Sequence, residues 1–147
     1  MSYNPNFRGD MSKAPTTSVE SLFKNGSGIF LNKLTPVCSN TSGDIVKVNV
    51  SDESTSLSVV GFTAEDIDKG EMGRVIVGGR LTDVDLDLAF GALYVAKNGE
   101  FTDVKPSVGV NGFDVGDFVV RVGVLVKNED DPLKKDIVLN VVLIGQL

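Results

Sequence analysis

The sequence predicts an all-β protein, a small antiparallel barrel or sandwich with an extended N-terminal arm and one short helix. In residues 70–145, short runs of aliphatic residues alternate with glycine or acidic turns. The 16 glycines supply many turns, and a hydrophobic fraction of 41% suffices for one core. We expect residues 1–27 to form the arm and helix, and residues 28–147 to form the β-barrel domain.

The arm contains three apolar side chains spaced four residues apart, Tyr3, Phe7 and Met11. Its first sixteen residues are otherwise polar and rich in turn formers, so they bury too little apolar surface to fold alone. The three side chains are either stray residues of a frayed tail or anchors that dock into a partner's grooves. Arg8 lies between them and begins an Arg-Gly-Asp tripeptide, a match too short to indicate adhesion.

A capping box predicts the short helix at residues 18–25. Thr17 is the expected N-cap, and Glu20 stands at the third helical position. Leu22 and Phe23 then share one face, and a glycine closes the segment. We expect this helix to join the arm to the barrel and to lie over its end.

Strands are expected over most of the remaining chain, at residues 28–38, 45–50, 57–62, 73–81, 93–96, 101–104, 118–127 and 137–144. Pro36 indicates an edge or a bend, because proline donates no ladder hydrogen bond. The glycine pair at residues 78–79 is typical of a bulge or barrel corner. Asn98 and Gly99 predict a hairpin turn.

Residues 82–88 alternate strictly between polar and apolar, with Asp83, Asp85 and Asp87 on one side. This segment is either a strand with an acidic outer face or an extended loop packed by its apolar side. An EF-hand needs glycine at its sixth position and glutamate at its twelfth, and both are missing here. We therefore expect a solvated acidic row and no metal site.

The composition disfavours catalysis and several classes of partner. The chain has no histidine, which removes the most frequent general base and metal ligand. Its single cysteine, Cys38, is expected to be a small buried hydrophobe. A net charge of −6 disfavours nucleic acid and anionic membrane as partners. We expect no enzyme activity, no cofactor, no spanning segment and no secretory signal, and hence synthesis in a cytoplasm.

The expected barrel core consists of aliphatic residues from the central and C-terminal strands, allowing for slips of one residue in face assignment: Val75, Val77, Leu93, Val120, Val122, Val124, Val138, Val141 and Leu143. The last strand ends in four consecutive apolar residues at 141–144, so both of its faces need cover. One face can lie on the core. The other needs a helix or another subunit, and the only expected helix is the short one at residues 18–25. Val142 and Ile144 are therefore the expected oligomer-interface residues.

The order of residues from 91 to 143 resembles the small β-barrel modules of tailed-phage virion proteins. These include capsid decoration (cement) proteins, head fibres and fibre-base domains. The resemblance lies in a Gly-x-Leu-Tyr run at residues 91–94, a turn with Gly99, a Pro-Ser pair at residues 106–107 and two further apolar strands. Residues 73–81 fit the same scheme. The motif consists of turn residues and strand hydrophobics, none of them catalytic.

The resemblance implies a homotrimer on the outer surface of a capsid, gripping the major capsid protein through its arm. On that basis we expect a structural virion protein, a bacteriophage decoration or cement protein that stabilises the head and assembles in the host cytoplasm. Tyr3, Phe7, Arg8 and Met11 are then the expected capsid-binding residues. The alternative is a small head-fibre or tail domain that recognises the host surface through loops such as residues 127–135.

Overall fold

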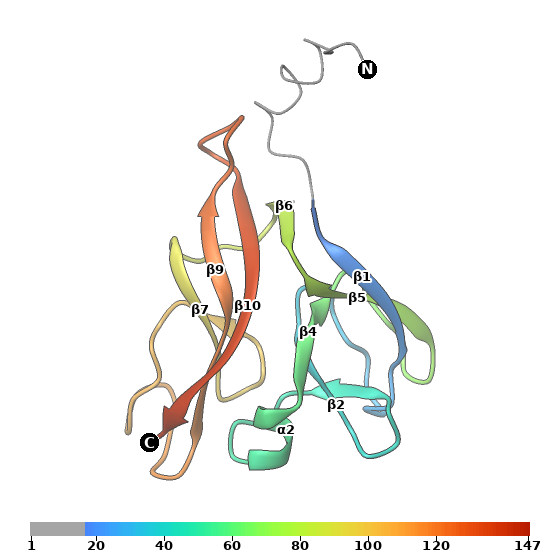
Figure 1. Ribbon diagram of the computed structural model, residues 1–147. Coiled ribbons are helices and arrows are strands. Elements are labelled where there is room, and N and C mark those ends of the chain that lie inside the picture. Colours follow the sequence, from blue (N-terminus) through green and yellow to red (C-terminus); the bar gives the residue numbers. More distant parts are fainter. Residues whose placement is uncertain (1–16) are drawn as a thin grey trace, which may run out of the picture.

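Two five-stranded antiparallel sheets make up the protein in the computed structural model, which describes residues 17–147 (Figure 1). The first sheet, in spatial order, comprises β1 (Val19–Lys24), β5 (Met72–Gly78), β4 (Val59–Thr63), β2 (Pro36–Ser39) and β3 (Ile45–Lys47). The second comprises β6 (Arg80–Val84), β10 (Lys135–Gln146), β9 (Phe118–Lys127), β7 (Gly91–Val95) and β8 (Phe101–Thr102). The expected all-β fold class is confirmed.

The first sheet curls on itself. A bridge between Asn25 and Ile45 brings the residue after β1 to the start of β3, although β1 and β3 are the two outermost strands. Leu31, Ile67 and Val75 form a small hydrophobic cluster with Val37 and Ile45 on this sheet. The curl makes the first sheet barrel-like, whereas the second sheet is an open layer beside it (Figure 1).

The main core lies between the two sheets and draws on both. Phe62 of β4 meets Phe101 of β8 edge to face, with ring centroids 5.6 Å apart. Buried aliphatic residues of the second sheet, such as Leu93 and Val122, complete this cluster. Burying side chains of this size contributes roughly 1.5–3 kcal/mol each, so this shared cluster holds the sheets together.

The chain crosses from the first sheet to the second at the glycine pair. β5 ends at Gly78, and β6 begins at Arg80. Gly79 has φ 81°, and a Cβ built there would lie 2.2 Å from the carbonyl oxygen of Thr17. Only glycine fits that left-handed backbone at such close range. The sharp corner expected from the glycine pair is confirmed.

The helix expected at residues 18–25 is wrong, because this segment is strand β1. Each residue of β1 faces a residue of β5, from Val19 opposite Gly78 to Lys24 opposite Met72. In this extended conformation Phe23 packs against the smaller hydrophobic cluster. Pairing with β5 thus overrides the local capping signal. Among the described residues the only helix is α2 (Glu53–Leu57), capped by the carboxylate of Asp52.

Four of the nine expected core residues are fully buried, namely Val75, Leu93, Val120 and Val122. The other five are only partly buried or are exposed: Val77, Val124, Val138, Val141 and Leu143. Register shifts interrupt the pairing of β10 with β9 and of β7 with β9. The extra residue in β9 leaves Val124 facing outward and Leu125 in the core, and their β10 partners Val138 and Ile137 lie on the same respective sides.

Residues 82–88 combine the two alternatives left open by the sequence. The strand β6 ends at Val84, and the chain continues as a loop. Val84 is buried, and Leu86 and Leu88 pack against the main core, whereas the three aspartates are exposed. The expected partition of apolar and acidic side chains is confirmed across both parts of the segment.

Candidate functional site

The four expected capsid-binding residues of the arm, Tyr3, Phe7, Arg8 and Met11, lie outside the described residues. The described chain begins at Thr17, whose amide donates to the carbonyl oxygen of Arg80. The capsid-binding role of the four arm residues therefore stays a prediction.

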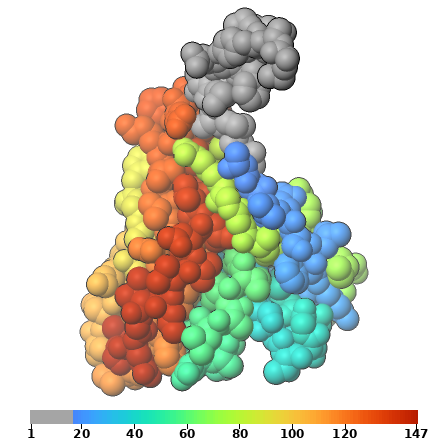
Figure 2. Space-filling model, in the orientation of Figure 1, coloured from blue at the N-terminus to red at the C-terminus, as the bar shows by residue number. Residues whose placement is uncertain are grey.

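The two expected oligomer-interface residues lie in the C-terminal half of β10. Val142 is half-buried and pairs with Arg121 of β9. Ile144 is 46% exposed, and the neighbouring Val141 and Leu143 are each 37% exposed. β10 lies along one face of the molecule (Figure 2). This concentration of exposed apolar side chains is compatible with an interface, which stays a prediction.

Arg121 lies on the outer face of the second sheet, directed away from the core. Its chain neighbours Val120 and Val122 are fully buried, so its own side chain points to the opposite face. Val142 and Tyr94 are its partners on either side, and neither carries a charge. The Nε atom of Arg121 is buried and has no hydrogen-bond partner among the described residues.

The two other arginines of the described chain are both paired. Arg74 bonds Glu20 and Glu65 on the surface of the first sheet. Arg80 bonds Asp136 through Nε at 2.9 Å and Nη2 at 2.8 Å. Arg121 therefore differs from both, because it presents a charged, planar donor group to an apolar face without an acceptor.

A fully buried carboxylate, Asp136, lies at the start of β10. Besides the ion pair with Arg80, it accepts a hydrogen bond from the Asp83 amide at 2.9 Å and one from Asn128 Nδ2 at 3.0 Å. Burial alone raises the pKa of Asp136, but the combined donors outweigh it and hold that pKa below its ordinary value. The group is ionised and joins β6, β10 and the end of β9.

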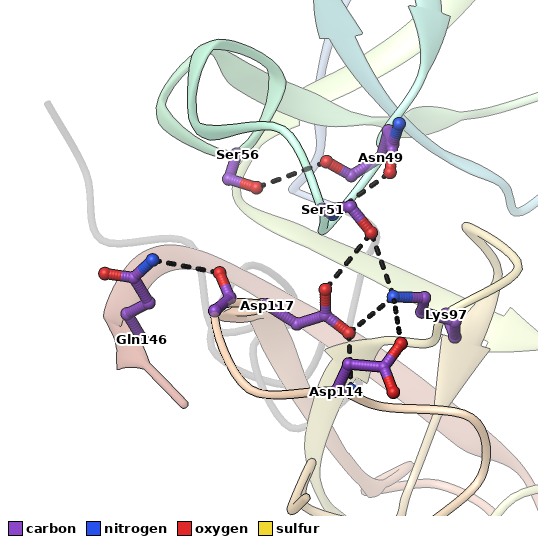
Figure 3. A network of polar contacts seen from close by, with 8 residues as sticks. Asn49, Ser51, Ser56, Lys97, Asp114, Asp117 and Gln146 are labelled. Atoms are coloured by element: carbon purple, nitrogen blue, oxygen red, sulfur yellow. Dashed lines mark hydrogen bonds and ion pairs between the residues drawn. The ribbon is translucent and has the colours of Figure 1, made fainter.

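A second polar cluster joins the two sheets near the C-terminus (Figure 3). Lys97 Nζ lies 2.5 Å from Asp117 Oδ2, 2.9 Å from Ser51 Oγ and 3.6 Å from Asp114 Oδ2. Ser51 lies between β3 and α2, within the part of the chain that forms the first sheet, whereas Lys97 and Asp117 belong to turns of the second. The amide of Asp114 also donates to Asp117 Oδ2, at 2.8 Å.

The protonation states of this cluster favour an ion pair. Burial raises the pKa of Asp117, but hydrogen bonds from Lys97, the Asp114 amide and Ser51 bring it below the ordinary value. The hydrogen bond to Asp117 raises the pKa of Lys97. Nucleophilic chemistry needs a neutral amine, and this geometry stabilises the ammonium. The cluster therefore acts as a structural link.

The sulfur of Cys38 is not arranged for reactivity. The residue is fully buried in the main core, and burial raises the pKa of its thiol to about 11. A thiol of that pKa is protonated at neutral pH and is a poor nucleophile. The expectation that Cys38 is a small buried hydrophobe is confirmed for its position.

The acidic row borders a hollow of about 290 Å³ between residues 32–35, 85–88 and 100–101. Asp85, Asp87 and Glu100 contribute to its lining. Asp83 is directed elsewhere and pairs with Lys134 at 3.3 Å. Within residues 17–147, no group of three or more carboxylates or cysteines is arranged to hold a metal ion.

No protein-family model matches this chain, and no curated protein matches it. The fold therefore classifies the protein only as a nearly all-β molecule of two antiparallel sheets, one of them curled. The described part of the chain contains no helix long and apolar enough to cross a membrane.

Three features of these sites were missed from the sequence, namely the unpaired Arg121, the buried Asp136 and the link between Lys97 and Asp117. Arg121 had one available signal, since it is the only charged residue inside the apolar run of residues 118–126. Asp136 follows two lysines at the end of a polar loop, where a surface position is the simplest expectation. No sequence pattern joins Lys97 to Asp117 across twenty residues.

Proposed function

We propose that this protein is a structural virion protein, a bacteriophage decoration or cement protein that binds the outer surface of the head. The observation that carries the proposal is the exposed apolar end of β10, at Val141, Leu143 and Ile144. An apolar strand end of this kind fits permanent protein contacts. The resemblance of residues 91–143 to phage virion modules supplies the biological setting.

In this function the arm binds the major capsid protein, and β10 contacts another copy of the chain. Tyr3, Phe7 and Met11 insert into the capsid surface, and Arg8 supplies a charge beside them. The assembly is a homotrimer, a number taken from the resemblance. It forms in the host cytoplasm and acts on the capsid exterior, without turnover, cofactor, metal, nucleic acid or membrane.

The buried polar groups support a structural role. Asp136 and Asp117 each accept several hydrogen bonds from other segments of the chain, so both carboxylates stabilise the fold. Cys38 is buried with a raised pKa. These arrangements favour a rigid module that acts through its surface.

The alternative is a head-fibre or tail domain that binds the host surface. The observation that favours it is the loop between β9 and β10, where Leu133 is 89% exposed. A protruding apolar residue in a polar loop is typical of a recognition tip. Copy number separates the two functions, because a cement protein covers the whole shell whereas a receptor binder occupies few sites.

The test uses particles of the encoding phage stripped of this protein, to which purified full-length chain is added back. We expect the full chain to cosediment at many copies per particle, and a chain lacking residues 1–15 to remain folded but unbound. Replacing Tyr3, Phe7 and Met11 together by serine should have the same effect, and Leu133→Ser is the matched control. Full binding by the truncated chain would contradict the role of the arm, and binding at only a few sites would favour the host-recognition function.

A further inference from the structure

We propose that the outer face of the second sheet binds an acidic surface of a second copy of this chain, with Arg121 as its polar anchor. In the contact, the guanidinium of Arg121 binds a carboxylate of the neighbouring copy. The inference deepens the self-association in the proposed function. It requires no capsid, because the purified chain alone tests it.

The outer face presents two rows of half-buried side chains across the strands. One row pairs Val138 with Val124 and Val124 with Ala92. The next row pairs Val142 with Arg121 and Arg121 with Tyr94. On β10, β9 and β7, Arg121 is the single charged residue of these two rows. The first row continues onto β6 with Arg80, which pairs with Val138 and whose charge is matched by Asp136.

These side chains point away from the core, which sits on the opposite side of the sheet. Leu93 and Val95 on either side of Tyr94 are fully buried, and the same holds for the neighbours of Arg121. In the described structure the other sheet packs only on the inner side, through residues such as Phe62 and Ile76. The outer face is thus a smooth apolar layer of the kind that packs against another sheet.

The unpaired guanidinium of Arg121 identifies the chemistry of the occupant. Its Nε is enclosed by the chain itself, whereas its two Nη groups are not buried and have no hydrogen-bond partner in the described chain, so a partner reaches the guanidinium through them. Its row partners, Val142 and Tyr94, offer no carboxylate. A planar guanidinium is best matched by a carboxylate, which binds its fork through two parallel hydrogen bonds.

Charge complementarity favours a second copy as the source of that carboxylate. The chain carries 20 acidic residues against 14 basic ones, so its own surface offers surplus carboxylates. An apolar layer with one unpaired cation therefore fits an acidic copy of the same protein. The exposed Ile144, two residues beyond Val142 on β10, continues the apolar surface toward the end of the strand and becomes covered in the same contact.

The first experiment measures the oligomeric state of the purified full-length chain by sedimentation velocity and native mass spectrometry. We expect a closed oligomer at micromolar concentration. Arg121→Met keeps an apolar stem and removes the donor group, so it should weaken association by roughly ten- to a hundredfold. Arg121→Glu should abolish association through repulsion. Arg74→Met is the matched control, because it removes an arginine from the other sheet.

The second experiment reports on the face itself. Cys38 is buried with a raised thiol pKa, so a single introduced cysteine is the only reactive thiol. Val142→Cys should react slowly with maleimide in the oligomer, and quickly once Arg121→Glu is added. Leu133→Cys, on the exposed loop, should react quickly in both backgrounds.

Circular dichroism and thermal unfolding test whether each variant is folded. If Arg121→Glu does not fold, the association of Arg121→Met and the labelling assay test the interface. A monomeric parent chain would overturn the inference and leave capsid binding through the arm intact. An oligomer in which Val142→Cys reacts as fast as Leu133→Cys would overturn it too, as would an Arg121→Met variant that associates like the parent.

Discussion

Replacing Asp136 by alanine tests whether the buried carboxylate holds β6 and β10 together. The change removes the acceptor of three hydrogen bonds, one of them from Arg80 Nε at 2.9 Å, and the ion-pair contact with Arg80 Nη2 at 2.8 Å. Breaking a buried ion pair typically costs about 3–5 kcal/mol. Arg80 is 26% exposed, so water partly restores its solvation. We therefore expect a loss of about 3 kcal/mol, toward the lower end of that range.

Urea unfolding at neutral pH measures this loss, and thermal unfolding should show a decrease of roughly 6–12 °C in Tm for a chain of this size. Asp85→Ala is the matched control, because Asp85 is an exposed aspartate of the neighbouring loop. It should change the free energy of unfolding by less than about 0.5 kcal/mol. If Asp136→Ala unfolded like Asp85→Ala, the carboxylate would not hold these strands together.

The pH dependence gives an independent check of the same group. The pKa of Asp136 is lower in the folded protein than its ordinary value, so folding favours the ionised form. Its contribution is complete above the ordinary aspartate value of about 3.9, and it disappears as the pH falls through the lower native pKa. The difference in stability between the parent and Asp136→Ala should therefore be constant at neutral pH and should shrink below that value. A difference that persisted unchanged into strong acid would refute the assignment.

Four further changes follow from the structure. Asp117→Ala leaves Lys97 and the Asp114 amide without their acceptor and should lower the free energy of unfolding by about 2 kcal/mol in urea. Gly79→Ala forces a Cβ against the Thr17 carbonyl at φ 81° and should lower Tm by several degrees, whereas an unchanged Tm would contradict the close approach. Val122→Asp places an unpaired charge in the main core and should be insoluble or unfolded, with a soluble protein of parental Tm as the contrary result. A chelator should leave the Tm of the parent unchanged, and a decrease would mean that an ion is bound.

Local patterns determined the fold class and several of its turns. Period-two alternation and frequent glycines predicted antiparallel strands, and the Asn98–Gly99 pair predicted the hairpin between β7 and β8. The glycine pair at residues 78–79 predicted a corner, since a left-handed backbone is a property of the residue itself. The exposure of the aspartates in residues 82–88 followed from the same alternation.

Tertiary structure decided which local signals prevailed. The capping box at Thr17 predicted a helix, but the segment forms strand β1 and pairs with β5. A partner strand stabilises a segment more than a helix cap does. Bulges in β9 and β10 changed which side chains face the core, and a bulge depends on how two distant strands fit. The pairing of distant strands placed Arg121 Nε where no described residue offers it an acceptor. It also placed Asp136 beside Arg80, a hydrogen-bond donor 56 residues away in the sequence. A linear pattern records the character of each residue, whereas pairing and burial depend on which distant residues become its neighbours.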